Sequence, residues 1–272
     1  MERMTDTTAG VPVSRPRATL SRWTDWGKWL ALISMTVDHV VRYALSNELS
    51  WQFGWASSTI GRVAFPLFAA MVAWHGLFDT RNPMRYARRI LVIGLIAQLP
   101  YMLMPRYSSV LVINVCFTLA FGLVWGAWLR QLLTSPPRET RARMISAAAV
   151  ALSVIVWYTV GPLLEYGRFG ILMVPGFMLA MAVYQHFDHG VARIWAWLAG
   201  VPILLITAQL NIYTISKSVA FSTTLVVLVI AAGLARWIPG VVRMPRWLWL
   251  GWYPGHLAVI ALIVYLPYLL PT

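Results

Sequence analysis

The sequence predicts an all-α fold, a polytopic integral membrane bundle of about nine transmembrane helices. Of its 272 residues, 59% are apolar and only 11% are charged, whereas soluble domains have roughly 45–50% apolar and about 25% charged residues. Stretches of about 20 residues without a charge recur, each able to cross a hydrocarbon core of ~30 Å, and lipid forces such segments to be helical. With Cys116 as its single cysteine, the chain is neither a disulfide-stapled nor a disordered protein.

The chain begins with a tail, residues 1–26, that is rich in Thr, Pro, Ser and Arg and has no apolar signal-peptide core. We expect this tail to be cytoplasmic and disordered, and residues 27–272 to form one transmembrane domain. The spacing of charges, Pro and Gly then predicts nine spans in order: 28–45, 57–78, 89–104, 109–131, 144–163, 169–186, 194–210, 218–237 and 247–270.

Lys and Arg residues are distributed unequally between the two sets of connections. Seventeen fall in the tail and the even-numbered connections, and three, Arg106, Arg168 and Lys217, fall on the other side. Because cytoplasmic loops carry the excess of Lys and Arg, we expect the N-terminus inside and the C-terminus outside. The formal net charge of +13 then reflects cytoplasmic loops, and no nucleic-acid partner is expected.

The first span carries four ionisable residues on one face. At about 100° per residue, Lys28 and His39 lie ~20° apart, and Asp38 and Arg42 are i,i+4 neighbours. A charge inside lipid costs ~2.5–3.5 kcal/mol, so this stripe needs a reason. Under a structural interpretation, Asp38 and Arg42 neutralise each other. Under a functional one, His39 is a general base whose tautomer is fixed by Asp38 or another carboxylate.

The second span and the loop after it carry further basic residues. Arg62, four residues before Pro66, forms either an ion pair with Asp38 or a contact to a substrate oxyanion or phosphate. His75, at the other end of this span, is expected to be an interfacial residue. The basic loop 79–89 is explained by the positive-inside rule alone, and a seat for a phosphorylated cytosolic cofactor is the alternative.

Two polar islands interrupt the middle of the chain. Asn114 and Thr118 lie one helical turn apart in a span, where helix–helix hydrogen bonding is the usual reason. Glu165 and Arg168 lie in the tight turn between the fifth and sixth spans, and we expect a solvated ion pair there.

The last span contains a histidine that packing alone does not explain. A Pro254-Gly255 step frees backbone groups directly before His256. No spacing of histidines or cysteines is typical of a metal site, and no phosphate-binding or serine-hydrolase motif occurs. Any chemistry must come from scattered polar groups that face a common cavity.

Seven short motifs resemble, in order, those of the TraX family of conjugation-associated membrane proteins. They are Gly27-Lys28 with Asp38-His39, Gly61-Arg62-Val-Ala-Phe-Pro66, Thr80-Arg81-Asn82 with Arg88-Arg89, Gln98-Leu-Pro100-Tyr101, Asn114-Val-Cys-Phe-Thr118, Tyr166-Gly-Arg-Phe-Gly170 and Tyr253-Pro254-Gly-His256. The resemblance runs from about residue 27 to the end of the chain.

The resemblance implies an acetyl-CoA-dependent acetyltransferase of the bacterial inner membrane that acts on the N-terminus of a conjugative pilin. TraX proteins are also remotely similar to bacterial multi-span acyltransferases, in which a basic residue precedes a functionally important histidine by eleven positions on the first helix. Lys28 and His39 match that spacing, with Lys where those relatives usually carry Arg.

From these observations we expect His39, assisted by Asp38, to be catalytic, and acetyl-CoA to be the co-substrate, without a metal. The residues expected to bind acetyl-CoA are Lys28, Arg85, Arg88 and Arg89. Those expected to contact the substrate are Arg62, Arg42, Asn114, Tyr253 and His256. The expected partners are the lipid bilayer and a pilin or other membrane-embedded acceptor.

This mechanism requires a continuous cavity from Lys28 to His39. The alternatives are an O-acyltransferase acting on a glycan or lipid, a small-solute or proton-coupled transporter, and a non-enzymatic pilus assembly factor.

Overall fold

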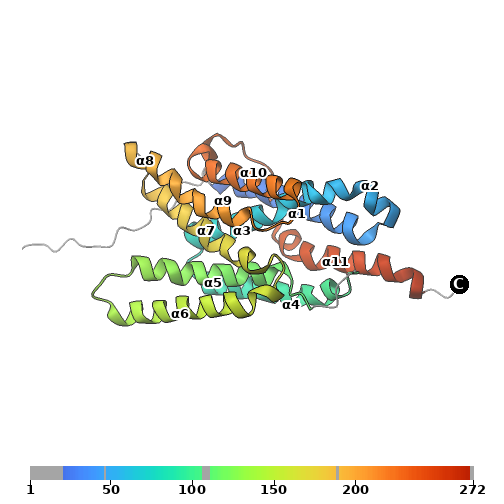
Figure 1. The fold of residues 1–272 in the computed structure, drawn as a ribbon, viewed down its shortest axis with the longest axis horizontal. Coiled ribbons are helices and arrows are strands. Elements are labelled where there is room, and N and C mark those ends of the chain that lie inside the picture. The colour runs from blue at the N-terminus through green and yellow to red at the C-terminus, as the bar shows by residue number, and fades with distance from the viewer. Residues whose placement is uncertain (1–20, 46, 106–110, 188–189, 270–272) are drawn as a thin grey trace, which may run out of the picture.

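A computed structural model describes residues 21–45, 47–105, 111–187 and 190–269, which form a helical bundle (Figure 1). The predicted all-α fold is confirmed, because these residues contain no β-strand beyond one bridge between Ile113 and Leu164. The α-helices are α1 (Arg22–His39), α2 (Asn47–Ser58), α3 (Ala64–Trp74), α4 (Pro83–Met102), α5 (Val115–Thr134), α6 (Thr140–Thr159), α7 (Gly167–His186), α8 (Gly190–Ala196), α9 (Val201–Thr207), α10 (Thr214–Ala231) and α11 (Arg246–Leu269).

Short turns of other helical types join or extend these helices. Two π-helical turns, η2 (Val40–Ala44) and η4 (His75–Asp79), continue α1 and α3, and the remaining turns are of the 3₁₀ type. The 3₁₀ turns are η3 (Ile60–Val63), η5 (Gly161–Leu163), η6 (Trp197–Gly200) and η7 (Leu234–Trp237).

A helix occupies each of the nine predicted spans, and within the described residues seven helical stretches are long and apolar enough to cross a membrane. They are Glu48–Asp79, Val115–Thr134, Thr140–Thr159, Gly167–His186, Gly190–Thr207, Thr214–Ala231 and Arg246–Leu266. The other two predicted spans correspond to α1 and α4, which carry more charge: α1 holds four charged residues and α4 holds three arginines.

The structure differs from the predicted boundaries in three places. Helix α2 lies in a segment that we expected to be a connection, and it exposes Trp51 and Trp55, which suit a membrane–water interface. Helix α1 begins at Arg22, inside the predicted tail, and the rest of that tail lies outside the described residues. The predicted span 194–210 is broken into α8, η6 and α9.

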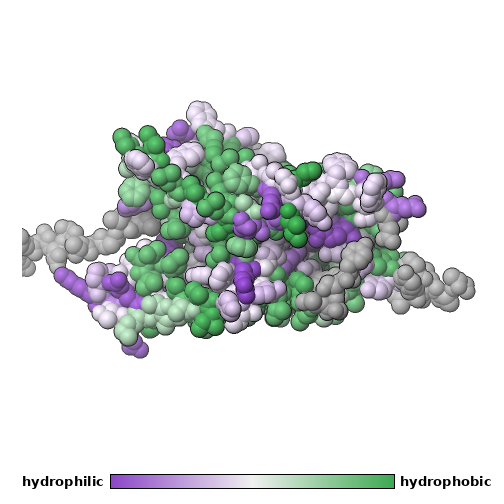
Figure 2. Space-filling model, in the orientation of Figure 1, coloured by the Kyte–Doolittle hydropathy of each residue, from purple (hydrophilic) through white to green (hydrophobic). Residues whose placement is uncertain are grey.

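Helix α3 forms the centre of the bundle. Ala69, Ala70 and Ala73 leave no accessible surface, so α1, α5, α7 and α10 pack closely around it. In Figure 1, α5 and α6 lie along one side of the bundle and α8, α9 and α10 along the other. Figure 2 shows apolar side chains over much of this face and hydrophilic ones gathered at the α5–α6 turn, as expected for lipid contact with wet ends.

The two ends of the bundle differ in how many Lys and Arg residues their connections contain. The basic end is formed by the connections 80–82, 135–139 and 238–245, and the α2 end by α2 and the connections 160–166 and 208–213. Hydrogen bonds fasten each end: Trp26 Nε1 donates to Pro239 O at the basic end, and Ser216 Oγ donates to Ser58 O at the α2 end.

Candidate active site

Two histidines from opposite ends of the sequence meet in the bundle. His39 Nδ1 lies 2.7 Å from His256 Nε2, and the ring planes are within 3° of parallel. Both residues are buried. His39 ends α1 and is followed directly by the π-helical turn η2, a feature frequent at functional sites. The structure therefore joins two histidines that the sequence singled out separately.

Hydrogen bonding assigns the protons of this pair. His256 Nδ1 lies 2.6 Å from the carbonyl oxygen of Trp252. Because a carbonyl oxygen only accepts, that nitrogen carries the hydrogen, and a neutral His256 then accepts at Nε2. His39 must donate from Nδ1, which leaves Nε2 of His39 as an unprotonated nitrogen. This tautomer is the one that a general base requires.

Asp38 does not hold His39 in this arrangement. Its Oδ1 accepts hydrogen bonds from Arg42 Nη2 at 3.1 Å, from Arg62 Nη2 and from Ser57 Oγ. The contact that orients the His39 ring, predicted for Asp38, is made by His256 instead. Asp38 and Arg62 form the structural ion pair that the sequence also allowed, with 8% and 11% of their side chains exposed.

Gly61 lets the Asp38 cluster, which is Asp38 with its donors Arg42, Ser57 and Arg62, lie against the backbone of η3. A Cβ at this position would lie 2.7 Å from both Cβ and Oδ1 of Asp38. No other residue type fits there without displacing the carboxylate, which explains the Gly-Arg sequence at the start of η3.

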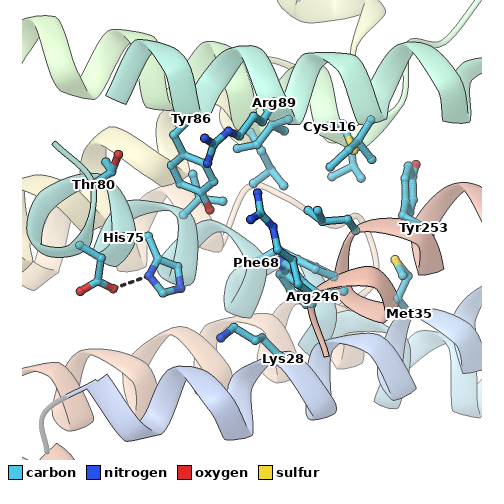
Figure 3. Close-up of a pocket in the computed structure, with 18 of the residues that line it drawn as sticks. Lys28, Met35, Phe68, His75, Thr80, Tyr86, Arg89, Cys116, Arg246 and Tyr253 are labelled. Carbon is cyan, nitrogen blue, oxygen red and sulfur yellow. Dashed lines mark hydrogen bonds and ion pairs between the residues drawn. The ribbon is translucent and has the colours of Figure 1, made fainter. Parts of the chain in front are cut away.

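A cavity of about 470 Å³ opens from the basic end toward the histidine pair. Figure 3 shows Lys28, Arg89 and Arg246 reaching it from three helices, with Cys116 and Tyr253 toward its other end. Arg81, Arg89 and Arg246 form no ion pair with an acid among the described residues, whereas Lys28 Nζ lies 3.0 Å from Asp25 Oδ1. Three cations of the cavity lining therefore have no ion-pair partner among the described residues, while Asp79, the acid of the lining, binds His75.

The structure sorts the predicted acetyl-CoA-binding residues into two groups. Arg85, Arg88 and Arg89 are all exposed, but only Arg89 of the three lines the cavity, together with Lys28. Arg246 lines it without having been predicted, because nothing in the sequence indicates which connections meet. His75 also lines the cavity, where Asp79 binds its Nδ1.

The inner end of the cavity adjoins the histidines. A small hollow of about 20 Å³ is lined by His39, Asp38 and Gly61, and it shares Tyr253 and three other lining residues with the large cavity: Met35, Phe68 and Val115. The hydroxyl of Tyr253 is buried and has no hydrogen-bond partner among the described residues. An unpaired buried hydroxyl is costly, so this group is available to a ligand in the cavity.

Asn114 does not contact either space. Its side chain caps α5 by accepting from Cys116 N at 3.0 Å, and its Nδ2 donates to Gly94 O and Gln98 Oε1, both at 2.8 Å. The prediction of substrate contact is thus replaced by the helix–helix role that the sequence also allowed. Thr118 likewise donates to Glu165 O at 2.8 Å.

The turn 164–166 supplies two groups that sequence reasoning assigned to solvent or left aside. Glu165 forms no ion pair with Arg168; it lines the hollow and accepts from Val115 N at 3.0 Å. Burial raises the pKa of the Glu165 carboxyl above its ordinary value. Tyr166 has a left-handed φ of 65° and stacks on Phe65, and such strain in a non-glycine residue is frequent at functional sites.

These features define a class: a multi-span helical membrane protein in which a basic cavity leads to a buried histidine pair. The TraX protein family model matches residues 24–264. The chain belongs to the TraX family.

Two curated relatives are similar over much of the chain. One is named "Probable fimbrial assembly protein FimC, serogroup H1", from Dichelobacter nodosus, and is 28% identical over 191 residues, which cover 70% of this chain and 73% of the relative. The other, "Uncharacterized protein RP591" from Rickettsia prowazekii (strain Madrid E), is 28% identical over 159 residues, covering 58% of this chain and 56% of the relative. No solved structure matches the chain.

Proposed function

We propose that this chain is a membrane acetyltransferase that transfers an acetyl group from acetyl-CoA to the N-terminus of a pilin. The single observation that carries the proposal is the cavity that begins among unpaired cations and ends beside a histidine whose free nitrogen is unprotonated. A transporter does not need this tautomer at a closed inner end.

The cavity suits the two parts of a coenzyme A thioester. Arg81, Arg89 and Arg246 offer guanidinium groups to phosphates, which they bind in charge-assisted, bidentate hydrogen bonds. The walls farther in are apolar and suit an uncharged arm: Phe68, Val72, Ile90, Ile93, Leu119, Trp249 and Leu250. The volume of about 470 Å³ falls in the range of about 300–1,000 Å³ common for ligand pockets.

The residues at the inner end of the cavity supply a general base for the amine and a hydrogen-bond donor for the acetyl carbonyl. Nε2 of His39 takes a proton from the acceptor amine while the amine nitrogen bonds to the acetyl carbon. His256 stabilises the positive charge that His39 then carries. Tyr253 Oη donates to the carbonyl oxygen as negative charge develops there. When the carbon–sulfur bond breaks, His39 returns the proton to the departing sulfur, so the products are an amide and a free thiol.

The pilin acceptor is supported by the family and by one relative. TraX resemblance implies a conjugative pilin, and the name of the Dichelobacter nodosus relative refers to fimbrial assembly. A pilin is hydrophobic and lies in the inner membrane, so its amino end reaches the bundle from the side. This pilus association also makes the bacterial inner membrane the proposed location.

The proposed orientation has the basic end in the cytoplasm, where acetyl-CoA is found. It is supported by the excess of Lys and Arg in the connections at that end. Reporter fusions after residues 140 and 272 test it: we expect the first to report the cytoplasm and the second the outside. Two cytoplasmic signals would contradict the proposed orientation.

Purified protein in detergent, supplied with radiolabelled acetyl-CoA and a pilin, tests the activity. Only an acetyltransferase requires thioester consumption and a labelled pilin. In cells, intact-mass measurement of pilin with and without this gene is the matching test. An unchanged pilin mass in a host that makes pili would overturn the pilin assignment.

A further inference from the structure

A second polar cavity lies at the α2 end, on the other side of the histidine site. Its volume is about 410 Å³. Its walls come from η2, α2, η3 and the start of α10 with the connection before it. The polar groups that line it are Arg42, Ser50, Ser57, Ser58, Arg62, Asn211 and Ser216. Neither the basic loops nor the proposed acetyl-CoA site explains such a lining.

Hydrogen-bond donors in this cavity are only partly used. Arg42 and Arg62 each bind Asp38 through Nη2, and Nη1 of each is in no recorded hydrogen bond among the described residues. The Arg42 side chain is 40% exposed, so its guanidinium faces the open space. Asn211 Nδ2 has only a long contact of 3.4 Å to Ser216 O. These groups are suited to bind carbonyl oxygens.

The wall between this cavity and the histidine hollow is thin. Arg42, Ser57 and Arg62 line the cavity and donate to Asp38, while Asp38 and His39 line the hollow. Asp38 and the side chains that donate to it therefore separate a molecule in this cavity from the hollow beside the proposed base. The cavity proposed for acetyl-CoA reaches the same hollow from the basic end.

We propose that this cavity binds the amino-terminal segment of a peptide, with backbone carbonyls on Arg42, Arg62 and Asn211 and the amine directed toward Asp38 and His39. The inference rests on the proposed acetyl transfer and assigns its acceptor site. A peptide fits better than a phosphate headgroup because five of the seven polar lining residues are neutral and Asp38 already binds one nitrogen of each guanidinium. The net positive charge of Asp38 with its two arginines favours the neutral amine, which is the form that attacks a thioester.

Cysteine protection tests this site without requiring catalysis. The chain has one native cysteine, Cys116, which is buried. Purified full-length Ser50→Cys protein, changed at a cavity-lining residue with no proposed peptide contact, is labelled in detergent with a maleimide in the presence of a short Ala/Gly peptide with a free α-amine, or of glycerol phosphate. Ser218→Cys, which lines a separate apolar groove on α10, is the matched control, and the parent chain gives the background.

We expect the peptide to slow labelling of the Ser50→Cys variant and to leave the Ser218→Cys variant unaffected. Adding Arg42→Gln should raise the peptide concentration needed by about tenfold, because a charge-assisted hydrogen bond is lost. Adding Lys217→Gln, a nearby cation outside the lining, should change nothing.

Protection by glycerol phosphate alone would overturn the proposal in favour of an anionic headgroup site. Absence of protection by either probe, or an Arg42→Gln variant that behaves like the parent, would also overturn it. Protection by the peptide in a protein that consumes no acetyl-CoA would keep the peptide site and reject the acetyltransferase activity, so the two failures are distinguishable.

Discussion

The arginines at the two ends of the bundle differ in whether a carboxylate of the chain binds them. At the basic end, Arg89 and Arg246 line an open cavity and meet no acid among the described residues. Near the α2 end, Arg42 and Arg62 both bind Oδ1 of one buried aspartate, Asp38. One region supplies a carboxylate that its two arginines share, and the other places no carboxylate within ion-pair distance of Arg89 or Arg246 among the described residues.

This difference separates structural charge from charge that awaits a ligand. A buried ion is tolerated only when it is paired, and removal of one partner leaves the other costly. Arg81, Arg89 and Arg246 are exposed and need no partner by this rule, and what suits an anion there is that the three gather at one cavity. The two histidines lie between these regions, where the cavity of about 470 Å³ ends.

Loss of the base between the two regions should give the largest effect. We expect His39→Ala to lower acetyl transfer by about 10²–10⁴-fold, the usual contribution of general acid–base catalysis. Abundance in the membrane should be unchanged, because His39 makes its recorded side-chain contacts within the site. The rate of transfer from radiolabelled acetyl-CoA is the measurement.

His186→Ala is the matched control for that experiment, since His186 is exposed at the end of α7. It should behave like the parent. A His39→Ala protein with activity close to that of the parent would contradict the assignment of His39 as the base.

The two regions should respond differently when each loses its acid. Asp38→Asn leaves the buried Arg62 guanidinium without its partner, and we expect a loss of about 3–5 kcal/mol in the free energy of unfolding. Asp25→Asn breaks the more exposed pairs with Lys28 and Arg243 at the basic end and should cost about 0–1 kcal/mol. Thermal unfolding in detergent compares them, and equal losses would show that Asp38 is not a buried counter-ion.

The spans were predictable because lipid imposes length and apolarity on every crossing segment. Helix α2 was not, because its 12 residues, Asn47–Ser58, mix Trp and Phe with polar residues and fall below the length of a span. The inward turn at Glu165 was missed as well. It depends on the bridge between Ile113 and Leu164, which joins two distant connections.

The site was predictable in its members and not in its pairings. His39 and His256 are each conspicuous as histidines inside apolar segments, but their contact across 217 positions depends on how α11 packs. The same packing brings Arg246 to the cavity and leaves Arg85 outside. A single sequence shows which residues share a face of one helix, but it does not show which faces of different helices meet.

The cations at the basic end should act on binding, not on folding. We expect Arg246→Gln to raise KM for acetyl-CoA by about tenfold or more, because a hydrogen bond to a charged group contributes about 1.5–3 kcal/mol. The effect should weaken as salt is added. Arg85→Gln, at an exposed position outside the cavity, is the matched control. Equal KM values for both variants would remove the cavity as the acetyl-CoA site.

The smallest expected effect tests how firmly the Asp38 cluster is fixed near the α2 end. In Gly61→Ala the new Cβ lies 2.7 Å from Oδ1 of Asp38, so the carboxylate must shift from its three donors, and we expect a loss of roughly 1–3 kcal/mol in the free energy of unfolding. Gly251→Ala on α11, which meets no atom within 4 Å, should instead stabilise by about 0.5–1 kcal/mol. Thermal unfolding of both variants is the measurement. If Gly61→Ala were as stable as Gly251→Ala, Asp38 would be free to move, and the region that supplies its own counter-charge would be as adaptable as the cavity at the basic end.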